Sequence, residues 1–321
     1  MGHFPFLETQ VEFLPNLSEE LGIDIFIKRD DLFQSAGGGN KARKLQYILY
    51  KAKQEDCNAL VTAGDINSNH CRATAMMAAT LGMKLKLIIH NDHPENEVYS
   101  QNLKIARLCG AEIIYCRKEN IASIMDDAMF GLKSDGYNPF YIWGGGHSLE
   151  GSFAYYDAVK YIKEQLYRDS IPPPEYVYFA SGTGTTHAGI HVGMKCFFPD
   201  AKVCGISIAR EKNRGASEVN KSILELEKYL GLPSLTDIDD VIFYDDFIVN
   251  GYESSCDDIY LLIKKIAKTD GLLLDPTYSG KAFWGMMNHI SQGIIPQGSS
   301  VLFWHTGGLF NLLSDHGHNS L

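Results

Sequence analysis

The sequence predicts an α/β protein whose two domains are built on mostly parallel sheets flanked by helices. Short apolar, β-prone segments alternate with helical segments along most of the chain, and this alternation is typical of parallel sheets covered on both faces. The chain has 321 residues, of which 45% are hydrophobic, so it can bury a core large enough for two moderate domains. We expect 50–155 to form a small domain, inserted into a larger one made of 1–49 and 156–321.

In the first half of the chain, segments rich in β-branched and aromatic residues alternate with segments of helical period. Residues 1–23 are expected to be irregular apart from a short helix near 18–21. Gly82 and Gly110 each follow a helical segment, where a positive φ ends a helix easily. The predicted strands are 24–28, 59–62, 85–89, 113–115 and 141–143. One predicted helix follows Asn40, and the others cover 69–81, 98–108, 121–132 and 148–166.

Three prolines at 172–174 precede a second series of strand and helix units. A buried strand at 176–180 runs through a glycine- and threonine-rich turn directly into a helix. Further helices are expected between the remaining strands, which the apolar pattern predicts at 203–208, 241–244 and 301–304.

Composition argues against several classes of partner. The formal net charge of −10 leaves no global basic surface for nucleic acid or an anionic membrane. The seven cysteines are scattered without a C-x-x-C pair, which indicates reduced thiols and neither disulfides nor a metal site. The N-terminus lacks a basic segment followed by an apolar one, and no apolar run reaches the length of a membrane span. We therefore expect a cytoplasmic protein without a metal, nucleic-acid or membrane partner.

A lysine that follows a glycine loop is the first candidate functional residue. Three glycines at 37–39 allow positive φ and a close approach of the backbone to a ligand, and Asn40 is a good N-cap. Lys41 then lies in the first turn of a helix, where the helix dipole lowers the pKa of its ammonium. A lowered pKa is what a Schiff-base lysine needs, because only the neutral amine attacks a carbonyl. The alternative is that Lys41, Arg43 and Lys44 form a solvated basic face.

The turn at 181–186 is a candidate phosphate site. It places backbone N–H groups, hydroxyls and a helix N-terminus around one point between a buried strand and a helix. It lacks the Gly-Lys-Ser/Thr ending of a nucleotide P-loop, and His187 stands where the dinucleotide fingerprint requires its third glycine. A small phosphate is therefore the favoured ligand, and an ordinary tight βα turn is the alternative.

Two further segments place polar groups at helix starts. Asn67–His70 opens the helix at 69–81, where side-chain donors could bind a carboxylate or simply cap the helix. Asp275–Lys281 precedes another helix, with Gly251-Tyr252 upstream. Helix caps alone would explain the first segment about as often as a binding site would, and the second segment taken singly is more often a structural turn.

Together and in this order, the motifs resemble the family of D-cysteine desulfhydrase and 1-aminocyclopropane-1-carboxylate (ACC) deaminase. These are pyridoxal-phosphate enzymes of fold type II, the tryptophan-synthase β fold, and the resemblance covers about 24–308. The motifs that carry it are Lys-Arg-Asp-Asp at 28–31, Gly-Gly-Asn-Lys at 38–41, Ser-Asn-His at 68–70, the turn at 181–186 and Asp-Pro-x-Tyr at 275–278.

The resemblance implies roles for individual residues around pyridoxal 5′-phosphate. Lys41 would bind the cofactor covalently, Lys44 would reach its phosphate, and Asn69 would bond its ring hydroxyl. Ser279 would face the pyridine nitrogen. The phosphate would lie against Gly182, Thr183, Gly184, Thr185 and Thr186.

The same resemblance implies a substrate side. Ser68 and His70 would lie near the substrate carboxylate, with Asn69 beside them. Tyr252 and Tyr278 would line the substrate, so that the catalytic set would be Lys41, Ser68, Tyr252 and Tyr278.

The chain departs from the family pattern at a few positions. Asn67 stands where the family usually has Gln, and Trp143 and His147 stand where smaller or different residues are expected. ACC deaminases resemble one another in a Glu after the Tyr of Asp-Pro-x-Tyr, whereas this chain has Ser279. A hydroxyl leaves the pyridine nitrogen neutral and the ring a weaker electron sink, which suits removal of the α-proton followed by β-elimination.

We therefore expect a homodimeric lyase that acts on a small amino acid by α,β-elimination, most simply D-cysteine to pyruvate, ammonia and hydrogen sulfide. ACC deamination and β-replacement in a biosynthetic pathway are the alternatives within the family. A non-catalytic binding protein would keep the phosphate turn but would not need Lys41. A dinucleotide-dependent oxidoreductase is disfavoured by the missing third glycine.

Overall fold

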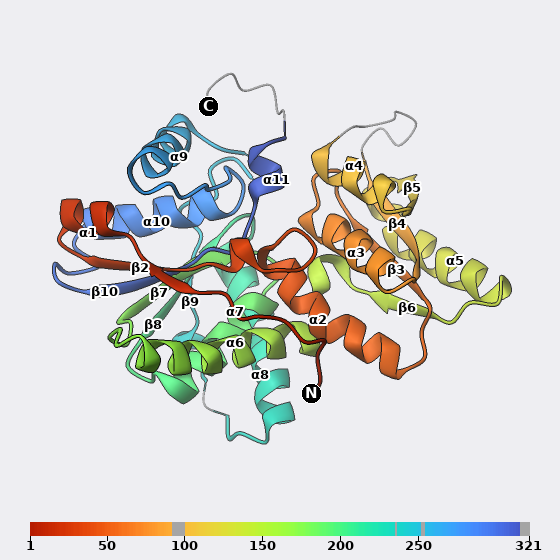
Figure 1. Cartoon of the computed structure of the whole chain (residues 1–321), viewed down its shortest axis with the longest axis horizontal. Helices are drawn as coiled ribbons and strands as arrows, with labels where there is room; N and C mark the ends of the chain where they lie inside the picture. Colours follow the sequence, from red (N-terminus) through yellow and green to blue (C-terminus); the bar gives the residue numbers. More distant parts are fainter. Residues whose placement is uncertain (92–99, 235, 252–253, 315–321) are drawn as a thin grey trace.

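Two sheets with helices on both faces make up the molecule (Figure 1). The computed structural model describes residues 1–91, 100–234, 236–251 and 254–314. The predicted α/β fold, with mostly parallel sheets flanked by helices, is confirmed.

The larger sheet has the strand order β1-β2-β10-β7-β8-β9, and all neighbours are parallel except β1 and β2. Strand β1 lies in the segment 1–23, which we expected to be irregular apart from a helix. Its three residues pair antiparallel with β2, with Val11 opposite Lys28, so its backbone bonds depend on a partner and not on a local pattern. The strands are β1 Val11–Phe13, β2 Asp24–Lys28, β7 Tyr176–Ser181, β8 Lys202–Ser207, β9 Ile242–Tyr244 and β10 Ser300–Trp304.

The smaller sheet has four parallel strands in the order β5-β4-β3-β6. Its central strand β3 is a nearly continuous apolar run, as expected for a strand that is covered on both faces, whereas β4 carries Lys84 and Lys86 near its start. The strands are β3 Ala59–Gly64, β4 Lys84–His90, β5 Glu112–Cys116 and β6 Pro139–Ile142.

The helices agree with the predicted positions to within a few residues. The predicted start of one helix at 98 lies outside the described residues, and its described part begins at Gln101 after the cap Ser100. The helices are α1 Pro15–Leu21, α2 Gly39–Gln54, α3 Asn69–Thr80, α4 Gln101–Leu108, α5 Ile121–Ser134, α6 Leu149–Arg168, α7 Thr185–Phe197, α8 Lys212–Leu230, α9 Asp257–Asp270, α10 Ser279–Ser291 and α11 Leu309–Leu312.

Each sheet face has its own hydrophobic core. In Figure 1, α1, α9 and α10 cover one face of the larger sheet, and α6, α7 and α8 lie on the other. Helix α5 covers one face of the smaller sheet, while α2, α3 and α4 pack on the opposite one. Helix α2, whose first turn contains Lys41, thus lies between the two sheets.

The domain limits stay a prediction. The strands of the larger sheet lie within 1–49 and 156–321, and those of the smaller sheet lie within 50–155. Helices α2 and α6 run across the two predicted limits.

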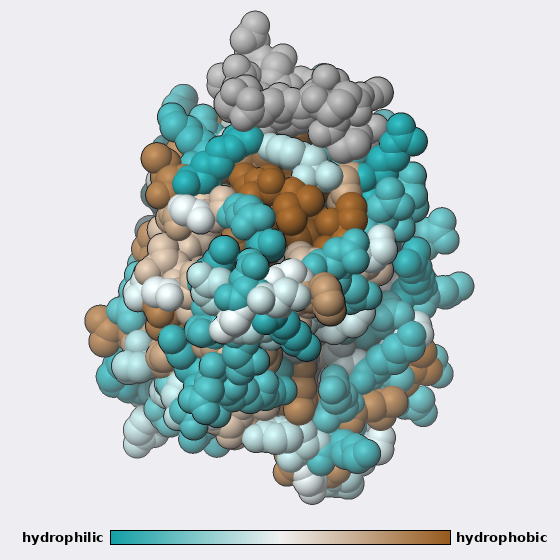
Figure 2. Space-filling view, turned by 90° about the vertical axis from the view of Figure 1, so that its right-hand side faces the viewer, coloured by the Kyte–Doolittle hydropathy of each residue, from teal (hydrophilic) through white to brown (hydrophobic). Residues whose placement is uncertain are grey.

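The surface on the side of the smaller sheet is mostly hydrophilic, with its widest hydrophobic area near the top of the view and smaller ones elsewhere (Figure 2). Within the described ranges, no helix combines the length and the apolar character needed to cross a membrane.

A buried network of charges lies behind α2. The carboxylate of Asp30 is fully buried and accepts hydrogen bonds from two nitrogens of Arg43, at 2.7 and 2.8 Å. Tyr155 and Trp304 each donate to the same carboxylate at 2.9 Å. Burial disfavours ionisation of Asp30, but the Arg43 guanidinium, together with Lys28 and the Trp304 hydrogen bond, outweighs burial and holds the pKa of this carboxyl at about 2.

We predict that Asp30→Asn lowers the free energy of unfolding by about 3–5 kcal/mol, because it removes the fully buried charge partner of the Arg43 guanidinium and leaves only Glu8 to balance it. The folded pKa of Asp30 lies below the unfolded value of about 3.9, so its contribution is present above that pH and is lost as the pH falls toward 2. Urea unfolding from pH 7 down to pH 3 should therefore show a flatter acid limb in the variant.

The matched control is Asp169→Asn, which removes an exposed carboxylate paired with Arg168 and should unfold like the wild type. Equal unfolding free energies of Asp30→Asn and the wild type would contradict a structural role for the network.

Candidate functional site

A cavity of about 530 Å³ lies where the strands of both sheets end. Residues that follow the C-terminal ends of β3, β6, β7, β8 and β10 line it, together with the start of α2. In open α/β sheets this edge is where ligands bind. The predicted site residues among its lining are Lys41, Lys44, Ser68, Asn69, His70, Gly182, Thr183, Gly184, Thr186 and Tyr278.

Three predicted residues are not among the lining. Thr185 and Ser279 are buried next to the cavity, and each engages another buried side chain. Tyr252 lies outside the described residues.

The glycine loop before α2 approaches other backbone segments closely. Gly38 has φ 77°, and a Cβ there would lie 2.1 Å from the carbonyl oxygen of Asp31. Gly39 has φ 88°, and a Cβ there would lie 2.9 Å from the carbonyl oxygen of Thr306. The loop therefore requires glycine at both positions, as predicted.

The predicted N-cap role of Asn40 is wrong, because the helix begins two residues earlier than that role requires and Gly38 is its N-cap. Asn40 instead donates its side-chain amide to the hydroxyl of Thr186, at 3.2 Å, and its backbone N–H to Thr306. The amide thus links the start of α2 to the turn at 181–186, across the cavity.

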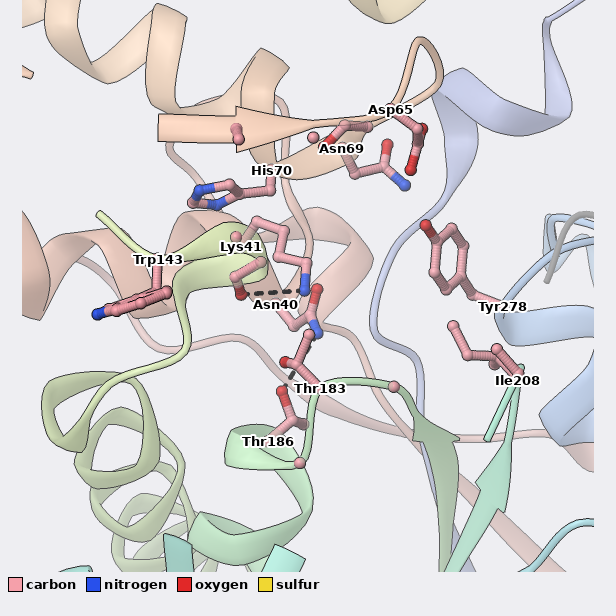
Figure 3. A pocket seen from close by; sticks show the side chains of 18 of the residues that line it. Asn40, Lys41, Asp65, Asn69, His70, Trp143, Thr183, Thr186, Ile208 and Tyr278 are labelled. Carbon is pink, nitrogen blue, oxygen red and sulfur yellow. Dashed lines mark hydrogen bonds between the residues drawn. The ribbon is translucent and has the colours of Figure 1, made fainter. Parts of the chain in front are cut away.

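Lys41 enters the cavity from the first turn of α2, as predicted. Its amine donates to the carbonyl oxygen of Gly145 at 3.2 Å, and Figure 3 shows it between the start of α3 and the turn at 181–186. Burial lowers the pKa of Lys41 to about 8, while the negative charge of Asp65 opposes that shift. The predicted lowering is therefore present, and its principal cause is burial.

The alternative of a solvated basic face is wrong, because Arg43 and Lys44 are both buried. Lys44 donates to the hydroxyl of Thr185 at 2.6 Å. Burial, and then repulsion from Lys41, lower the pKa of Lys44 well below its usual value. Two amines with little compensating charge thus lie next to the predicted phosphate turn.

The turn between β7 and α7 has the geometry of an anion site. Gly184 is the N-cap of α7 with φ 108°, so the first N–H groups of the helix are not covered by a capping side chain. Thr183 and Thr186 line the cavity beside them, and Arg210 donates to the carbonyl oxygen of Gly182 at 3.0 Å. Backbone donors, hydroxyls and cations together fit a phosphate.

The start of α3 contributes a cap and a neutral histidine. Ser68 is the N-cap and accepts from the N–H of Cys71 at 3.2 Å. The hydroxyl of Thr62 donates to Ile142 and therefore accepts from Nε2 of His70, at 2.9 Å. Burial and nearby lysines lower the pKa of His70 to about 3, so Nδ1 keeps a lone pair that has no partner within the described ranges. Nδ1 of His70 can therefore accept a hydrogen bond from a ligand donor. The predicted contact with a substrate carboxylate would need the tautomer that carries its proton on Nδ1.

The turn at 275–279 is organised by a buried carboxylate. Asp275 accepts from the N–H groups of Thr277, Tyr278 and Ser279, and from the Ser279 hydroxyl at 2.7 Å. Ser279 is thus held against Asp275, while Tyr278 faces the cavity (Figure 3).

The two unusual residues near 143–147 also lie at the site. Trp143 lines the cavity and is 64% exposed. Nδ1 of His147 donates to the carbonyl oxygen of Thr183 at 3.1 Å, so this histidine supports the phosphate turn from outside the lining.

Asp65, Arg210 and Thr306 line the cavity but were not singled out from the sequence. Each lies a few residues after a predicted strand. The rule that parallel strands bring their C-terminal ends to one edge could have identified all of them. Asp65 accepts from the N–H of Asn67 at 2.8 Å, which holds its carboxylate next to the start of α3.

The chain matches the family described as pyridoxal-phosphate dependent enzyme over residues 5–307. It is 34% identical to D-cysteine desulfhydrases of Klebsiella pneumoniae subsp. pneumoniae and of Salmonella newport, and each match covers 99% of this chain and 98% of the relative. A solved ACC deaminase homologue has a TM-score of 0.85 and 29% identity, covering 97% of this chain and 92% of its own. A fungal L-serine ammonia-lyase from Rhizomucor miehei has a TM-score of 0.66 at 16% identity, covers 94% of this chain and 93% of its own, and supports the fold alone.

The site fits the cofactor of this family. The turn at 181–186 and Lys44 could bind the phosphate of the cofactor, and the amine of Lys41 could react with its aldehyde. A Cβ on Gly145 would lie 2.9 Å from the Thr183 side chain and 3.5 Å from that amine, so glycine keeps this part of the cavity open. The resemblance stated from the motifs is confirmed, and the chain belongs to the family of pyridoxal-phosphate dependent enzymes.

Proposed function

We propose that this enzyme is a lyase that converts D-cysteine and water into pyruvate, ammonia and hydrogen sulfide by α,β-elimination. The observation that carries the proposal is Lys41, an amine of lowered pKa beside an anion-binding turn, in a chain 34% identical to D-cysteine desulfhydrases. Pyridoxal phosphate, when bound, supplies an electron sink that stabilises negative charge at the substrate Cα.

Lys41 is the attachment point for the cofactor aldehyde, because its lowered pKa leaves part of the amine neutral near pH 7. With the cofactor and substrate bound, the same amine would serve as the base for the α-proton of the substrate. Lys44 binds the cofactor phosphate together with Gly182, Thr183, Gly184 and Thr186, and Thr185 acts by holding the Lys44 amine.

The substrate carboxylate binds at the N-terminus of α3, where Ser68 and Asn69 supply donors. Asn69 also bonds the hydroxyl of the cofactor ring. Tyr278 and Tyr252 handle protons on the substrate side, and His70 completes this wall of the cavity.

Ser279 is assigned to the pyridine nitrogen. The Ser279 hydroxyl donates to Asp275 in this structure. A hydrogen bond to the pyridine nitrogen therefore requires the hydroxyl proton to be shared with the ring or turned toward it. A hydroxyl cannot hold the nitrogen protonated as a carboxylate does, and the modest sink that results favours loss of a thiolate over opening of a cyclopropane ring.

ACC deaminase is the second candidate, favoured by the TM-score of 0.85 to an ACC deaminase homologue. We further propose a cytoplasmic homodimer with a large domain of 1–49 and 156–321 and a small domain of 50–155. The scattered cysteines and the division of the strands between two sheets support the location and the domain limits.

Borohydride reduction of the cofactor-loaded enzyme should fix the cofactor on Lys41, and Lys41→Ala should lose both the adduct and the visible absorption. Peptide mass spectrometry identifies the modified lysine. Lys195→Ala, which removes a surface amine paired with Asp240, is the control and should label like the wild type. An adduct on Lys44 in the unmodified enzyme would refute the assignment.

The rate of cofactor attachment to the apoenzyme should rise with pH up to about 8 and then level off, because only the neutral Lys41 amine reacts. Asp65→Asn removes a charge that raises the pKa of Lys41, so the midpoint of the profile should move to lower pH. Stopped-flow absorbance measures the rate. An Asp65→Asn midpoint at or above that of the wild type would count against this electrostatic coupling.

Turnover of D-cysteine, D-β-chloroalanine and ACC on one preparation tests the proposed reaction. We expect both β-substituted substrates to release pyruvate at least about ten-fold faster than ACC releases its 2-keto acid, a difference of about 1.4 kcal/mol in activation free energy. The keto acids are quantified by chromatography. Faster turnover of ACC would move the assignment to ACC deaminase.

A further inference from the structure

The ammonium of Lys281, in the first turn of α10, is directed at main-chain carbonyl oxygens from two separate segments. The side chain is fully buried, and Nζ donates to the carbonyl oxygens of Ile208 at 3.3 Å, Ile248 at 3.1 Å and Gly251 at 2.8 Å. Carbonyl oxygens that converge on one charge are the arrangement by which proteins replace the hydration shell of a potassium ion.

The turn at 248–251 has an unfavourable backbone conformation, and two of its carbonyl oxygens point at the Lys281 ammonium. Val249 has φ 64°, which is unfavourable for a β-branched residue, and Gly251 has φ 133°. The N–H of Gly251 donates to the carbonyl oxygen of Ile248 at 3.4 Å. Such strain persists only where other interactions compensate for it, and the bonds to Lys281 supply that compensation.

The positive charge of Lys281 is partly balanced by a carboxylate near the start of the same helix. Asp275 is buried three residues before Tyr278, and its negative charge raises the pKa of Lys281 against the larger lowering by burial, which leaves that pKa at about 8. A cation is therefore stabilised here by both carbonyl dipoles and a buried carboxylate.

Lys281 lies next to one wall of the cavity, to which Ile208, one of its three named carbonyl partners, contributes. Ile208 lines the cavity, and so does Tyr278, which precedes Lys281 by three residues on the same turn. The turn at 248–251 leads directly to Tyr252, whose assignment to the substrate side is part of the proposed function.

We propose that Lys281 is a positioning residue that serves as a built-in monovalent cation and joins the end of β8, the turn at 248–251 and the start of α10 into one wall. The enzyme then needs no dissociable cation at this position. Truncation of the side chain should turn the same carbonyl groups into a site for a potassium ion.

The distances indicate which ion would replace the ammonium. The nitrogen-to-oxygen distances of 2.8–3.3 Å are longer than the roughly 2.0–2.1 Å of magnesium or 2.3–2.6 Å of calcium coordination. A large monovalent ion fits without contraction of the carbonyl groups, whereas lithium is too small to reach them together.

The test compares the cofactor-loaded wild type with Lys281→Ala and Lys281→Met in potassium, lithium and choline chloride at equal concentration. The alanine leaves space for an ion, whereas the methionine keeps an apolar stem that blocks it. At about 0.2 M, an ion that binds with a Kd of about 20 mM would occupy its site about ten to one and so raise the thermal midpoint measurably. Visible absorbance reports cofactor content in each salt.

We expect the wild type to have the same thermal midpoint and kcat/KM in all three salts. Lys281→Ala should be less stable in choline and lithium, and potassium should raise its midpoint by about 2–4 °C and restore part of its kcat/KM. Lys281→Met should stay destabilised in every salt. The thermal readout does not depend on the proposed substrate, so it can succeed or fail separately from it.

A purely structural lysine would give no such dependence on the identity of the ion. The proposal is overturned if Lys281→Ala behaves alike in potassium and choline, or if it folds in neither. It is also overturned if Lys281→Met responds to potassium as the alanine variant does, or if the wild type itself requires potassium.

Discussion

The buried carboxylate of Asp30 is the interaction on which the site depends, because it joins the elements behind the cavity. It follows β2 and accepts hydrogen bonds from Arg43 on α2, Tyr155 on α6 and Trp304 on β10. Desolvating these ions is costly, and the cost is recovered only when every partner is present. Since Arg43 is two residues from Lys41 on the same helix, the position of the guanidinium also determines where the Lys41 amine enters the cavity.

Helix α2 carries three cations within four residues, of which Arg43 and Lys44 are buried, and each is stabilised differently. Arg43 is neutralised by the carboxylates of Asp30 and Glu8. Lys44 donates to a threonine hydroxyl and Lys41 to a main-chain carbonyl, and in the described part of the chain neither amine forms an ion pair. Both lysines therefore have lowered pKa values. The lack of a nearby negative charge makes the Lys41 amine reactive. It also favours binding of a phosphate next to the two lysines, because the phosphate would supply that negative charge.

The sequence alone determined the elements and turns whose physics is local. Strands β3 and β7 and helices α3 and α5 could be predicted from the spacing of their apolar residues. A buried strand needs apolar residues in succession and a helix needs them every three or four residues, so each element can be read from a short stretch of sequence. The turn at 181–186 and the loop before Lys41 were recognisable because only glycine tolerates their backbone conformations, which leaves a visible signature. The order of these motifs along the chain was enough to identify the family.

The tertiary structure alone decided what depends on contacts between distant segments. Strand β1 forms because β2 offers it a partner for its backbone hydrogen bonds. The cap of α2 moved from Asn40 to Gly38 because the loop packs against other backbone. The pKa of Lys41 is set mainly by burial between two sheets, and no local pattern records how much water a folded chain will exclude from an amine.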